Sequence, residues 1–409
     1  MLGIYLHIPF CVKKCFYCDF YSIETAYGAS NTEIINKYNQ KIDDNLVNPF
    51  LSAIRNEIKI RTQDRQNRIE VDSIFLGGGT PSLLSENQIT SLFQYLYDVF
   101  KISPDSEITI ECNPGTLSSE KLKVYKEIGI NRLSIGVQSF IPDELKFLQR
   151  IHTAGDVINS FQMSRDFGFD NISLDLIFSI PGQSKESLIY SLSKAVELQP
   201  DHISAYSLIF EKGTPLYNEM KKGKIKPVDE KTDSLFYETV IDFLADNGFN
   251  QYEVSNFAKN GKFCNHNLKY WHNEEFLAFG PSAHGFYDNI RYKNKRNLKS
   301  YINILQSNKL PSEYEEFQND NLKIIDTIFL GLRSDGIDLN RLIFHYNLNL
   351  REILEEELVL YKQEKLIIDS LNKISLTKKG YKICDSITVD IITKVEKFLK
   401  NKNSQITIN

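Results

Sequence analysis

Strand-like and helix-like stretches alternate along the first 260 residues of this 409-residue chain. Short apolar runs that read as strands are separated by amphipathic stretches, and these runs are residues 3–8, 72–79, 107–112, 132–137, 172–178 and 202–209. Strands that alternate with helices form βα units around a parallel sheet. Because crossovers of this kind are right-handed, the pattern predicts an α/β fold, a partial (β/α)6 barrel of the TIM type. A doubly wound open sheet is the alternative that the same pattern permits.

Local signals set the ends of several predicted helices. Ser85 followed by Gln88 predicts a capping box for a helix over 85–100, and Gly129 is typical of a helix end. The interval after the first strand is longer than the others. We expect the Asn-rich segment 28–48 to be a surface excursion before a helix at 50–60.

The pattern changes near residue 320. Three short helices, two short strands about a turn and a final helical tract predict a small α+β, winged-helix-like domain. We expect a core at 1–250, a connecting region at 251–320 and the C-terminal domain at 321–409. Winged-helix domains often bind DNA, which would suit a regulator that senses cofactor status. Three consecutive glutamates at 355–357 and a net charge of −5 oppose nucleic-acid binding, so a packing or substrate-covering role is favoured.

Composition restricts where the protein works. No apolar run is long enough to span a membrane, so we expect no direct membrane insertion. The start "MLGIYLHIPF" lacks the features of a signal peptide. The chain has only six cysteines, which suits a cytoplasmic protein whose clustered thiols bind metal or do redox chemistry.

Half of these cysteines lie on one short stretch. Cys11, Cys15 and Cys18 form C-x3-C-x2-C directly after the first predicted strand. A zinc site would need a fourth ligand, and a disulfide would leave one thiol over. Three thiolates suit a 4Fe–4S cluster whose fourth iron stays open. Such an iron can chelate S-adenosylmethionine, and an electron from the cluster can cleave a carbon–sulfur bond of its sulfonium.

Other polar residues follow the predicted strands. Glycines 77–79 and Thr80 end the second strand and either admit a ligand to the backbone or form a plain tight turn. Glu111 and Gln138 end the third and fourth strands, and Asp175 lies in the fifth. Since functional groups of parallel barrels gather at the carboxyl ends of the strands, we expect one common mouth. Arg150 could pair there with a carboxylate.

Five motifs together resemble the coproporphyrinogen-III-oxidase-like family of the radical SAM superfamily, over essentially the full chain. They are "YLHIPFCVKKCFYCDF", "FLGGGTPS", "ECNPG", "RLSIGVQSF" and "DLIFSIPGQ". The resemblance implies that Cys11, Cys15 and Cys18 bind a 4Fe–4S cluster. It further implies S-adenosylmethionine contacts, several of which form a second S-adenosylmethionine site in the dehydrogenases of that family, from Tyr5, Tyr17, Gly78, Gly79, Thr80, Glu111, Gln138, Arg150 and Asp175.

Three features indicate which branch of the family the chain resembles. The oxygen-independent coproporphyrinogen III dehydrogenases carry a further cysteine two residues after the third, where this chain has Phe20, and an extra segment before the first strand. "HNLKYW" (266–271) is similar to the H-N-x-x-Y-W motif of the haem chaperones in the family. The resemblance thus implies a protein that binds haem and transfers it to acceptor haemoproteins, among them membrane-associated respiratory enzymes. A dehydrogenase that decarboxylates propionates to vinyls is the alternative.

In the chaperone reading, haem contacts come from His266, Tyr270 and Trp271. A histidine can ligate haem iron and a tryptophan offers a flat face to a porphyrin, but a histidine beside aromatic residues is often simply packed inside a protein. We also expect His284, within "FGPSAHGF" (279–286), to lie in a loop over the cofactor mouth. Cys264 is a lesser ligand candidate, and Cys112 and Cys384 read as ordinary thiols. Whether S-adenosylmethionine is cleaved, and so whether the protein is an enzyme, is left open.

Overall fold

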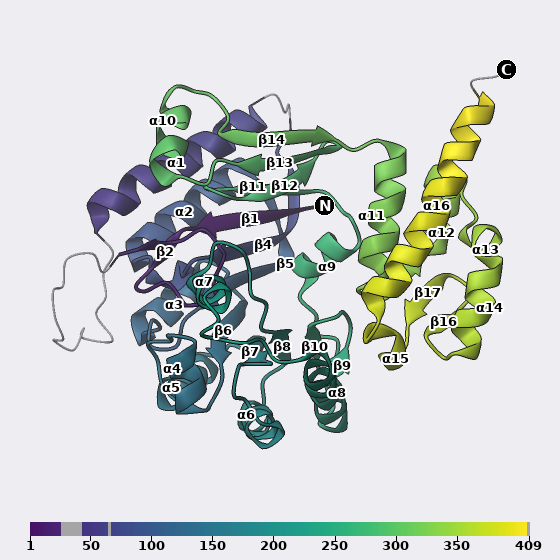
Figure 1. Cartoon of the computed structure of the whole chain (residues 1–409). Helices are drawn as coiled ribbons and strands as arrows, with labels where there is room; N and C mark the ends of the chain where they lie inside the picture. Colours follow the sequence, from purple (N-terminus) through teal and green to yellow (C-terminus); the bar gives the residue numbers. More distant parts are fainter. Residues whose placement is uncertain (26–42, 64–66, 407–409) are drawn as a thin grey trace.

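One twelve-stranded sheet organises most of the computed structural model, which describes residues 1–25, 43–63 and 67–406 (Figure 1). Its strand order is β14-β13-β12-β11-β1-β4-β5-β6-β7-β8-β10-β9. All six predicted strands are confirmed, and each pairs in parallel with the next along the chain. They are β1 (Leu2–Ile8), β4 (Glu70–Gly78), β5 (Lys101–Cys112), β6 (Arg132–Gln138), β7 (Ile172–Phe178) and β8 (His202–Ser207).

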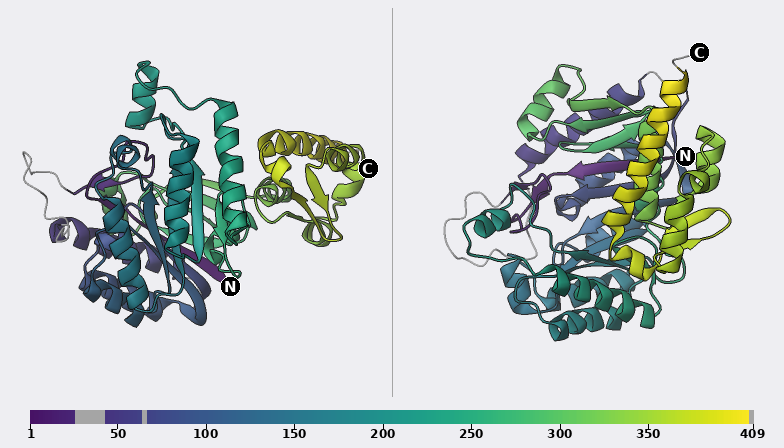
Figure 2. Two further views of the ribbon diagram at one scale, coloured as in Figure 1. Left: turned by 90° about the horizontal axis from the view of Figure 1, so that it is seen from below. Right: turned by 45° about the vertical axis from the view of Figure 1, so that its right-hand side comes forward.

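The strand order decides between the two predicted architectures. In a doubly wound sheet the order reverses at a switch point, whereas here the six parallel strands follow chain order without reversal. Right-handed crossovers that all advance in one direction place their helices on a single face. The helices accordingly lie outside the curved sheet (Figures 1 and 2). The partial barrel is confirmed, the doubly wound alternative is wrong, and the pairing within the described residues is that of an open arc.

The outer helices begin and end near their predicted signals. The capping box of Ser85 and Gln88 is present, and Gly129, with φ +90°, follows the last residue of α3. The predicted helix at 50–60 lies within a longer helix that starts at Asp44. The surface excursion predicted for 28–48 therefore ends before residue 44. Its residues 28–42 lie outside the described residues. The outer helices are α1 (Asp44–Thr62), α2 (Glu86–Val99), α3 (Ser119–Glu127), α4 (Pro142–Phe147), α5 (Ala154–Asp166), α6 (Lys185–Glu197) and α8 (Glu230–Asp246).

The region 251–320 does more than connect, because its strands extend the sheet at both edges. Beside β8 lie β10 (Asn256–Ala258) and β9 (Asn250–Gln251), the second an edge strand of two residues. On the far side of β1 the sheet adds β11 (Phe276–Phe279), which is parallel to β1, and then β12 (His284–Tyr287), β13 (Ile290–Asn294) and β14 (Ser312–Phe317). The region also forms α9 (Asn265–Trp271) and α10 (Leu298–Gln306). Smaller elements elsewhere are β2 (Phe10–Cys11), β3 (Ile23–Glu24), the 3-10 turn Pro81–Leu83 and α7 (Pro215–Lys221).

The C-terminal residues form helices around a three-stranded sheet, ordered β15-β17-β16. The hairpin expected near residue 370 is present, whereas the third predicted helix is divided in two at Leu354. The elements are α11 (Asp320–Leu332), β15 (Ile337–Asp338), α12 (Leu339–Tyr346), α13 (Leu350–Ile353), α14 (Glu355–Gln363), β16 (Ile367–Asp369), β17 (Lys373–Leu376), α15 (Lys378–Tyr381) and α16 (Cys384–Ile406).

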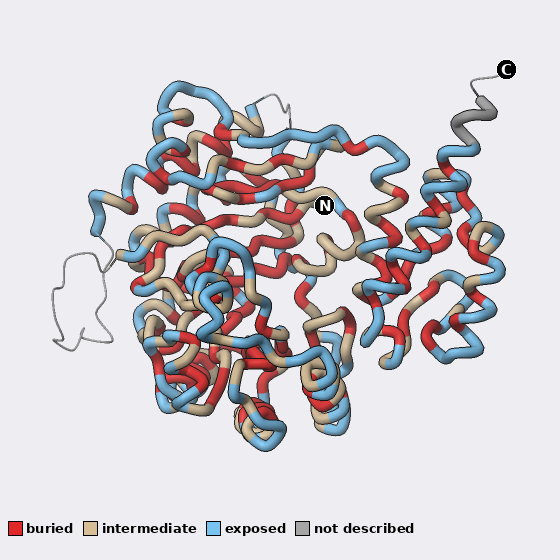
Figure 3. The backbone as a smooth tube through the Cα atoms, in the orientation of Figure 1, coloured by how far each residue is buried: buried red, intermediate tan, exposed pale blue. Residues whose placement is uncertain are grey.

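Two large apolar cores stabilise the part of the chain that the structure describes. The larger follows the barrel strands and their helices as far as Leu305, and the second is formed by buried residues between Ile324 and Leu399 (Figure 3). Cys112 belongs to the first core and Cys384 to the second. The divisions at 250 and 320 stay predictions, and "C-terminal domain" below means the residues around the second core. No helix in the described ranges is long and apolar enough to cross a bilayer.

Candidate functional site

The three-cysteine loop leaves the end of β1 and is held there by the glycine loop. The backbone N–H of Gly79 donates to the carbonyl of Ile8 at 2.8 Å, and that of Thr80 donates to the carbonyl of Phe10 at 2.7 Å. A Cβ on Gly79 would lie 2.7 Å from both of these carbonyl oxygens. The glycine is therefore required by packing, because the loop after β4 and the base of the cysteine loop touch backbone to backbone.

Polar side chains from the neighbouring strands and loops contact the cysteine loop. The Thr80 hydroxyl lies 3.6 Å from the Cys11 sulfur, and Nη1 of Arg150 lies 3.2 Å from that of Cys15. The Asn113 side chain joins the two, since it donates to the Thr80 hydroxyl at 2.9 Å and accepts from Arg150 at 2.7 Å. Arg150 also donates to the carbonyl of Gly136. Its hydrogen-bond partners in the described chain are thus a thiol, an amide and a carbonyl, and its pairing with a carboxylate stays a prediction.

The donor set of this loop fits an iron–sulfur cluster. Cys11, Cys15 and Cys18 are unpaired and partly exposed. No group of three His, Cys, Asp or Glu side chains among the described residues could hold a single metal ion, and a 4Fe–4S cluster instead takes each thiolate on a different iron. Burial raises the pKa of Cys11, and raises that of Cys18 to about 12. A bound metal favours the thiolate, so iron ligation would offset the cost of ionising these buried thiols.

A cavity of about 660 Å³ opens inside the arc beside this loop. The structure places Tyr5, Gly78, Glu111 and Asp175 of the predicted S-adenosylmethionine contacts in its wall. The other predicted contacts are not among its lining residues. These are the residues of the loop and its supports, Tyr17, Gly79, Thr80, Gln138 and Arg150.

Gln138 and Tyr17 shape the entrance of the cavity, the first through its backbone and the second through packing. Gln138 has a φ of +67° at the end of β6, where the pairing with β7 shifts register. Tyr17 packs, with Phe16 and Phe147, against a small apolar cluster that includes Leu148 and Leu216. This cluster seats the cysteine loop on the barrel.

Two acidic side chains, Glu111 and Asp175, line one part of the cavity. Glu111 accepts the N–H of Gly78 at 3.1 Å, but burial and the nearby Asp175 raise the pKa of Glu111 to about 8. Burial also raises the pKa of Asp175, although it accepts hydrogen bonds from Ser134 at 2.8 Å and Ser173 at 3.2 Å. Carboxylates pair well with an ammonium group and with ribose hydroxyls. A cationic group bound beside them would favour their ionised forms, so the two residues fit S-adenosylmethionine, whose sulfonium and amino group are cationic.

Arg132 is a cavity residue that sequence reasoning missed. It is buried at the start of β6, it lines the cavity, and its Nε has no hydrogen-bond partner in the described part of the chain. Burial disfavours its charge, but the nearby Glu107 carboxylate contributes to raising its pKa, so a permanent cation stands in the barrel wall. The signal was present in "RLSIGV", where Arg132 and Ser134 alternate with apolar residues as inward-facing positions of a strand do.

The motif "HNLKYW" forms the short helix α9 at the opposite end of the strands from the cysteine loop (Figure 1). His266 lies beside Gly3 at the start of β1. Its Nδ1 is 2.9 Å from the Ser73 hydroxyl and its Nε2 is 2.8 Å from that of Tyr270. Burial lowers the pKa of His266 to about 3. Both ring nitrogens of this neutral imidazole are thus in use, and the role of His266 as an iron ligand stays a prediction.

The start of α9 is fixed by a carboxylate from the barrel. Glu107 on β5 accepts the backbone N–H groups of Asn265 at 2.9 Å and His266 at 3.1 Å, a favourable place for a negative charge at a helix start. The Cys264 sulfur lies 3.5 Å from the same carboxylate and is fully buried. These contacts anchor the motif helix to β5.

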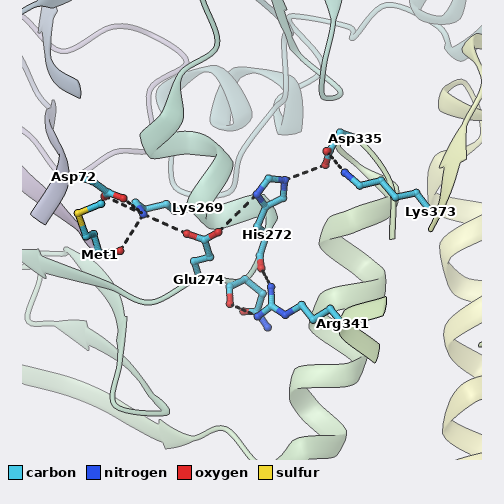
Figure 4. A network of polar contacts seen from close by, with 9 residues as sticks. Met1, Asp72, Lys269, His272, Glu274, Asp335, Arg341 and Lys373 are labelled. Carbon is cyan, nitrogen blue, oxygen red and sulfur yellow. Dashed lines mark hydrogen bonds and ion pairs between the residues drawn. The ribbon is translucent and has the colours of Figure 1, made fainter. Parts of the chain in front are cut away.

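The far end of α9 lies between the barrel and the C-terminal domain (Figure 4). Lys269 binds Asp72 at 3.0 Å and Glu274 at 3.2 Å. His272 binds Asp335 at 3.0 Å, and Asp335 also binds Lys373. Arg341 donates to the carbonyls of residues 272 and 273. The helix therefore joins the start of β4 to the second apolar core.

The remaining motif residues face two different cavities. Tyr270 lines the 660 Å³ cavity, whereas Trp271 lines a second cavity of about 550 Å³ between α9 and α12. The structure thus does not gather His266, Tyr270 and Trp271 around one site. His284, expected in a loop over the cofactor mouth, lies at the start of β12 and lines the 660 Å³ cavity.

The chain is similar to known proteins over most of its length. The family described as the radical SAM superfamily matches residues 5–195. The heme chaperone HemW of Bacillus subtilis (strain 168) is 38% identical over 93% of this chain and 96% of its own, and that of Escherichia coli (strain K12) is 37% identical over 69% and 70%. The structure of coproporphyrinogen III oxidase (HemN) from Escherichia coli covers 96% of this chain and 90% of its own, with a TM-score of 0.78 and 22% identity, and so has the same fold.

Proposed function

This chain belongs to the HemW family of heme chaperones within the radical SAM superfamily, and we propose that it binds haem and transfers it to acceptor haemoproteins. The observation that carries the proposal is the 660 Å³ cavity beside the cysteine loop. Its wall presents carboxylates near that loop, and aromatic and basic residues along β11–β13. One half suits a cationic cofactor and the other suits a flat, apolar ring with anionic side chains.

Each cofactor has its own residues in this proposal. Cys11, Cys15 and Cys18 hold the 4Fe–4S cluster, and the charge of Arg150 beside Cys15 offsets part of the negative charge of the thiolates. Glu111 and Asp175 hold the cationic groups of S-adenosylmethionine. When bound and reduced, the cluster would supply the electron for chemistry at the sulfonium of S-adenosylmethionine. The residues of the chain bind and orient this cofactor, and the proposal does not require that it be cleaved.

We place the protein in the cytoplasm. In this proposal its haem acceptors include membrane-associated respiratory enzymes. Clustered free thiols suit a reducing compartment. No described helix crosses a membrane, so in this proposal such acceptors are reached by transient contact.

Phe20 favours the chaperone over a coproporphyrinogen dehydrogenase. It occupies the position two residues after Cys18, is 63% exposed and lines the cavity rim. The extra thiol that the resemblance implies for the dehydrogenases is therefore replaced by an apolar ring facing the cavity. An apolar ring at this position suits binding of a flat tetrapyrrole.

The test is anaerobic reconstitution of the cluster, followed by parallel assays with haem and with coproporphyrinogen III, each with S-adenosylmethionine and reductant. We expect the protein to retain haem, to pass it to an apo-haemoprotein and to form no protoporphyrinogen. Cys15→Ala should lose the cluster, whereas Cys384→Ala, in the C-terminal core, should keep it. Release of carbon dioxide from coproporphyrinogen together with 5′-deoxyadenosine would contradict the proposal and identify a dehydrogenase.

A further inference from the structure

The half of the 660 Å³ cavity away from the carboxylates is formed by one face of β11–β13. Phe276 pairs with Phe286, which pairs with Arg291, so these three side chains form one row across the strands. His284 pairs with Lys293 in the next row. Since residues two apart on a strand share a face, both rows point to the same side. All five residues line the cavity, which therefore has an aromatic and basic wall here.

His284 differs from the buried histidines of the barrel. His266 has both ring nitrogens bound, and so has His202, which contacts Ser173 and Tyr252. His284 is exposed, and no hydrogen bond to its imidazole is found within the described ranges. Partial burial and the charge of Lys293 lower its pKa. A neutral imidazole with a free nitrogen is a common axial ligand of haem iron.

The same wall offers flat apolar contacts and positive charge. The guanidinium of Arg291 lies 5.0 Å from the Phe286 ring and is already paired with Asp326 at 2.7 Å. Lys293 lies 3.6 Å from the Glu313 carboxylate. Arg296, at the rim, donates to a backbone carbonyl at Asp19 and has no carboxylate partner among the described residues. Arg296 and, more weakly, Lys293 are thus available to bind carboxylates.

We propose that haem lies against the β11–β13 face, with His284 as an axial ligand of its iron and its propionates toward Arg296 and Lys293. The inference rests on the proposed function and locates the haem site within the cavity. The ligand bond uses the lone pair of a ring nitrogen and changes no oxidation state. Haem would then occupy the same cavity that Glu111 and Asp175 line. The role of His266 in this arrangement is to hold α9 in position.

The first experiment compares hemin binding to the full-length, cluster-reconstituted protein and to two histidine variants. His284→Ala should lose the histidine-ligated signature in resonance Raman and electron paramagnetic resonance spectra and bind hemin at least about tenfold more weakly. Added imidazole should restore the signature. His345→Ala is the matched control, since His345 is exposed on α12 and does not line this cavity. Retained S-adenosylmethionine binding shows that each variant is folded.

The second experiment tests the propionate contacts. The double variant Lys293→Gln, Arg296→Gln should bind hemin about five- to tenfold more weakly, whereas its affinity for hemin dimethyl ester, which lacks the propionate charges, should equal that of the unchanged protein. An equal loss for both compounds would overturn the assignment of these cations.

The outcomes separate the inference from the proposed function. If the unchanged protein does not bind hemin, the proposed function fails. If it binds and His284→Ala keeps the histidine-ligated signature, only the inference fails. If His266→Gln loses this signature while its circular dichroism stays unchanged, the iron ligand is His266 and the inference is overturned.

Discussion

Gly79 is the residue at which the two loops of the site meet most closely. A Cβ there would lie 2.7 Å from the carbonyl oxygens of Ile8 and Phe10, and backbone cannot move aside as a flexible side chain can. We expect Gly79→Ala to lower the free energy of unfolding by about 1–3 kcal/mol and to reduce cluster occupancy. Gly155→Ala is the control, because its Cβ would meet only the Thr153 hydroxyl at 3.7 Å. Urea unfolding and iron content check both variants, and equal stability of the two would contradict the packing argument.

Glu111 should make the protein without cofactor less stable as the pH rises. Its pKa is about 8 in the folded chain, against an ordinary value of 4.5, so between these values the folded state holds a proton that the unfolded state has released. Stability contributed by this group therefore falls from about pH 5 to about pH 8. Glu111→Gln should reduce that fall by roughly 1–3 kcal/mol, as measured by urea unfolding at both pH values. Asp105→Asn, at an exposed position of β5, should leave the fall unchanged.

Residue identity alone was enough to predict a cluster-binding role for the cysteine loop, which stays a prediction, but not to predict the contacts of the buried polar groups. Three cysteines at this spacing have few other uses, whereas a histidine in an aromatic setting is either a ligand or a packed side chain. Which partner occupies the Nδ1 atom of His266 depends on Ser73, almost two hundred residues away in the chain. Arg132 was missed for a related reason, because its surroundings come from several strands.

Among the elements, α9 is linked to the C-terminal domain by His272, the residue after the helix, which binds Asp335 (Figure 4). Burial alone would raise the pKa of Asp335, but hydrogen bonds from His272 and Lys373 outweigh it and lower the pKa to about 2. The contribution of this carboxylate is therefore present above about pH 4 and is lost as the pH falls toward 2. Asp335→Asn should cost about 0.5–1 kcal/mol at neutral pH, since these groups are over a third exposed and screened by solvent.

Hydrogen exchange of α9 and β15 tests where Asp335→Asn destabilises the protein. We expect faster exchange there in Asp335→Asn than in Asp338→Glu, whose carboxylate is an N-cap that accepts the N–H of Arg341 within the C-terminal domain. Unchanged exchange in α9 would show that Asp335 does not couple the two parts.

The six parallel strands were predictable because each is a local apolar run with a helix beside it. The strands β11–β14 were not, since they are short and β11 pairs with β1, far away in the chain. Residues 276–317 therefore read as a connection, although several of them line the 660 Å³ cavity. The break of the third C-terminal helix at Leu354 was also missed, because Leu354 fits an unbroken apolar pattern.

At the scale of the whole molecule, charged contacts join the C-terminal domain to the barrel. Lys378 binds Asp242, and Lys382 binds Glu238 at 3.2 Å, so α15 is held against α8. Reversing both charges in Lys378→Glu, Lys382→Glu places carboxylates opposite carboxylates. We expect α8 and α15 to exchange hydrogen faster and the melting transition to separate into two, one for each core.

Lys379→Glu is the matched control, because Lys379 binds Glu364 inside the same domain. It should leave the interface protected. A single unchanged transition in the double variant would show that apolar packing alone holds the two parts together. High salt should act in the same direction as the charge reversal, since exposed ion pairs are screened.

The ends of the twelve-stranded sheet bear on how the protein behaves in a crowded cell. An exposed edge strand is a template on which another polypeptide can add a strand. Here one edge, β14, has the sequence "SEYEEF" with three glutamates, and the other, β9, has only two residues. Charge at one edge and brevity at the other hinder intermolecular strand addition. The sheet can therefore be large without seeding aggregation, even when the protein meets partners that are not yet fully folded.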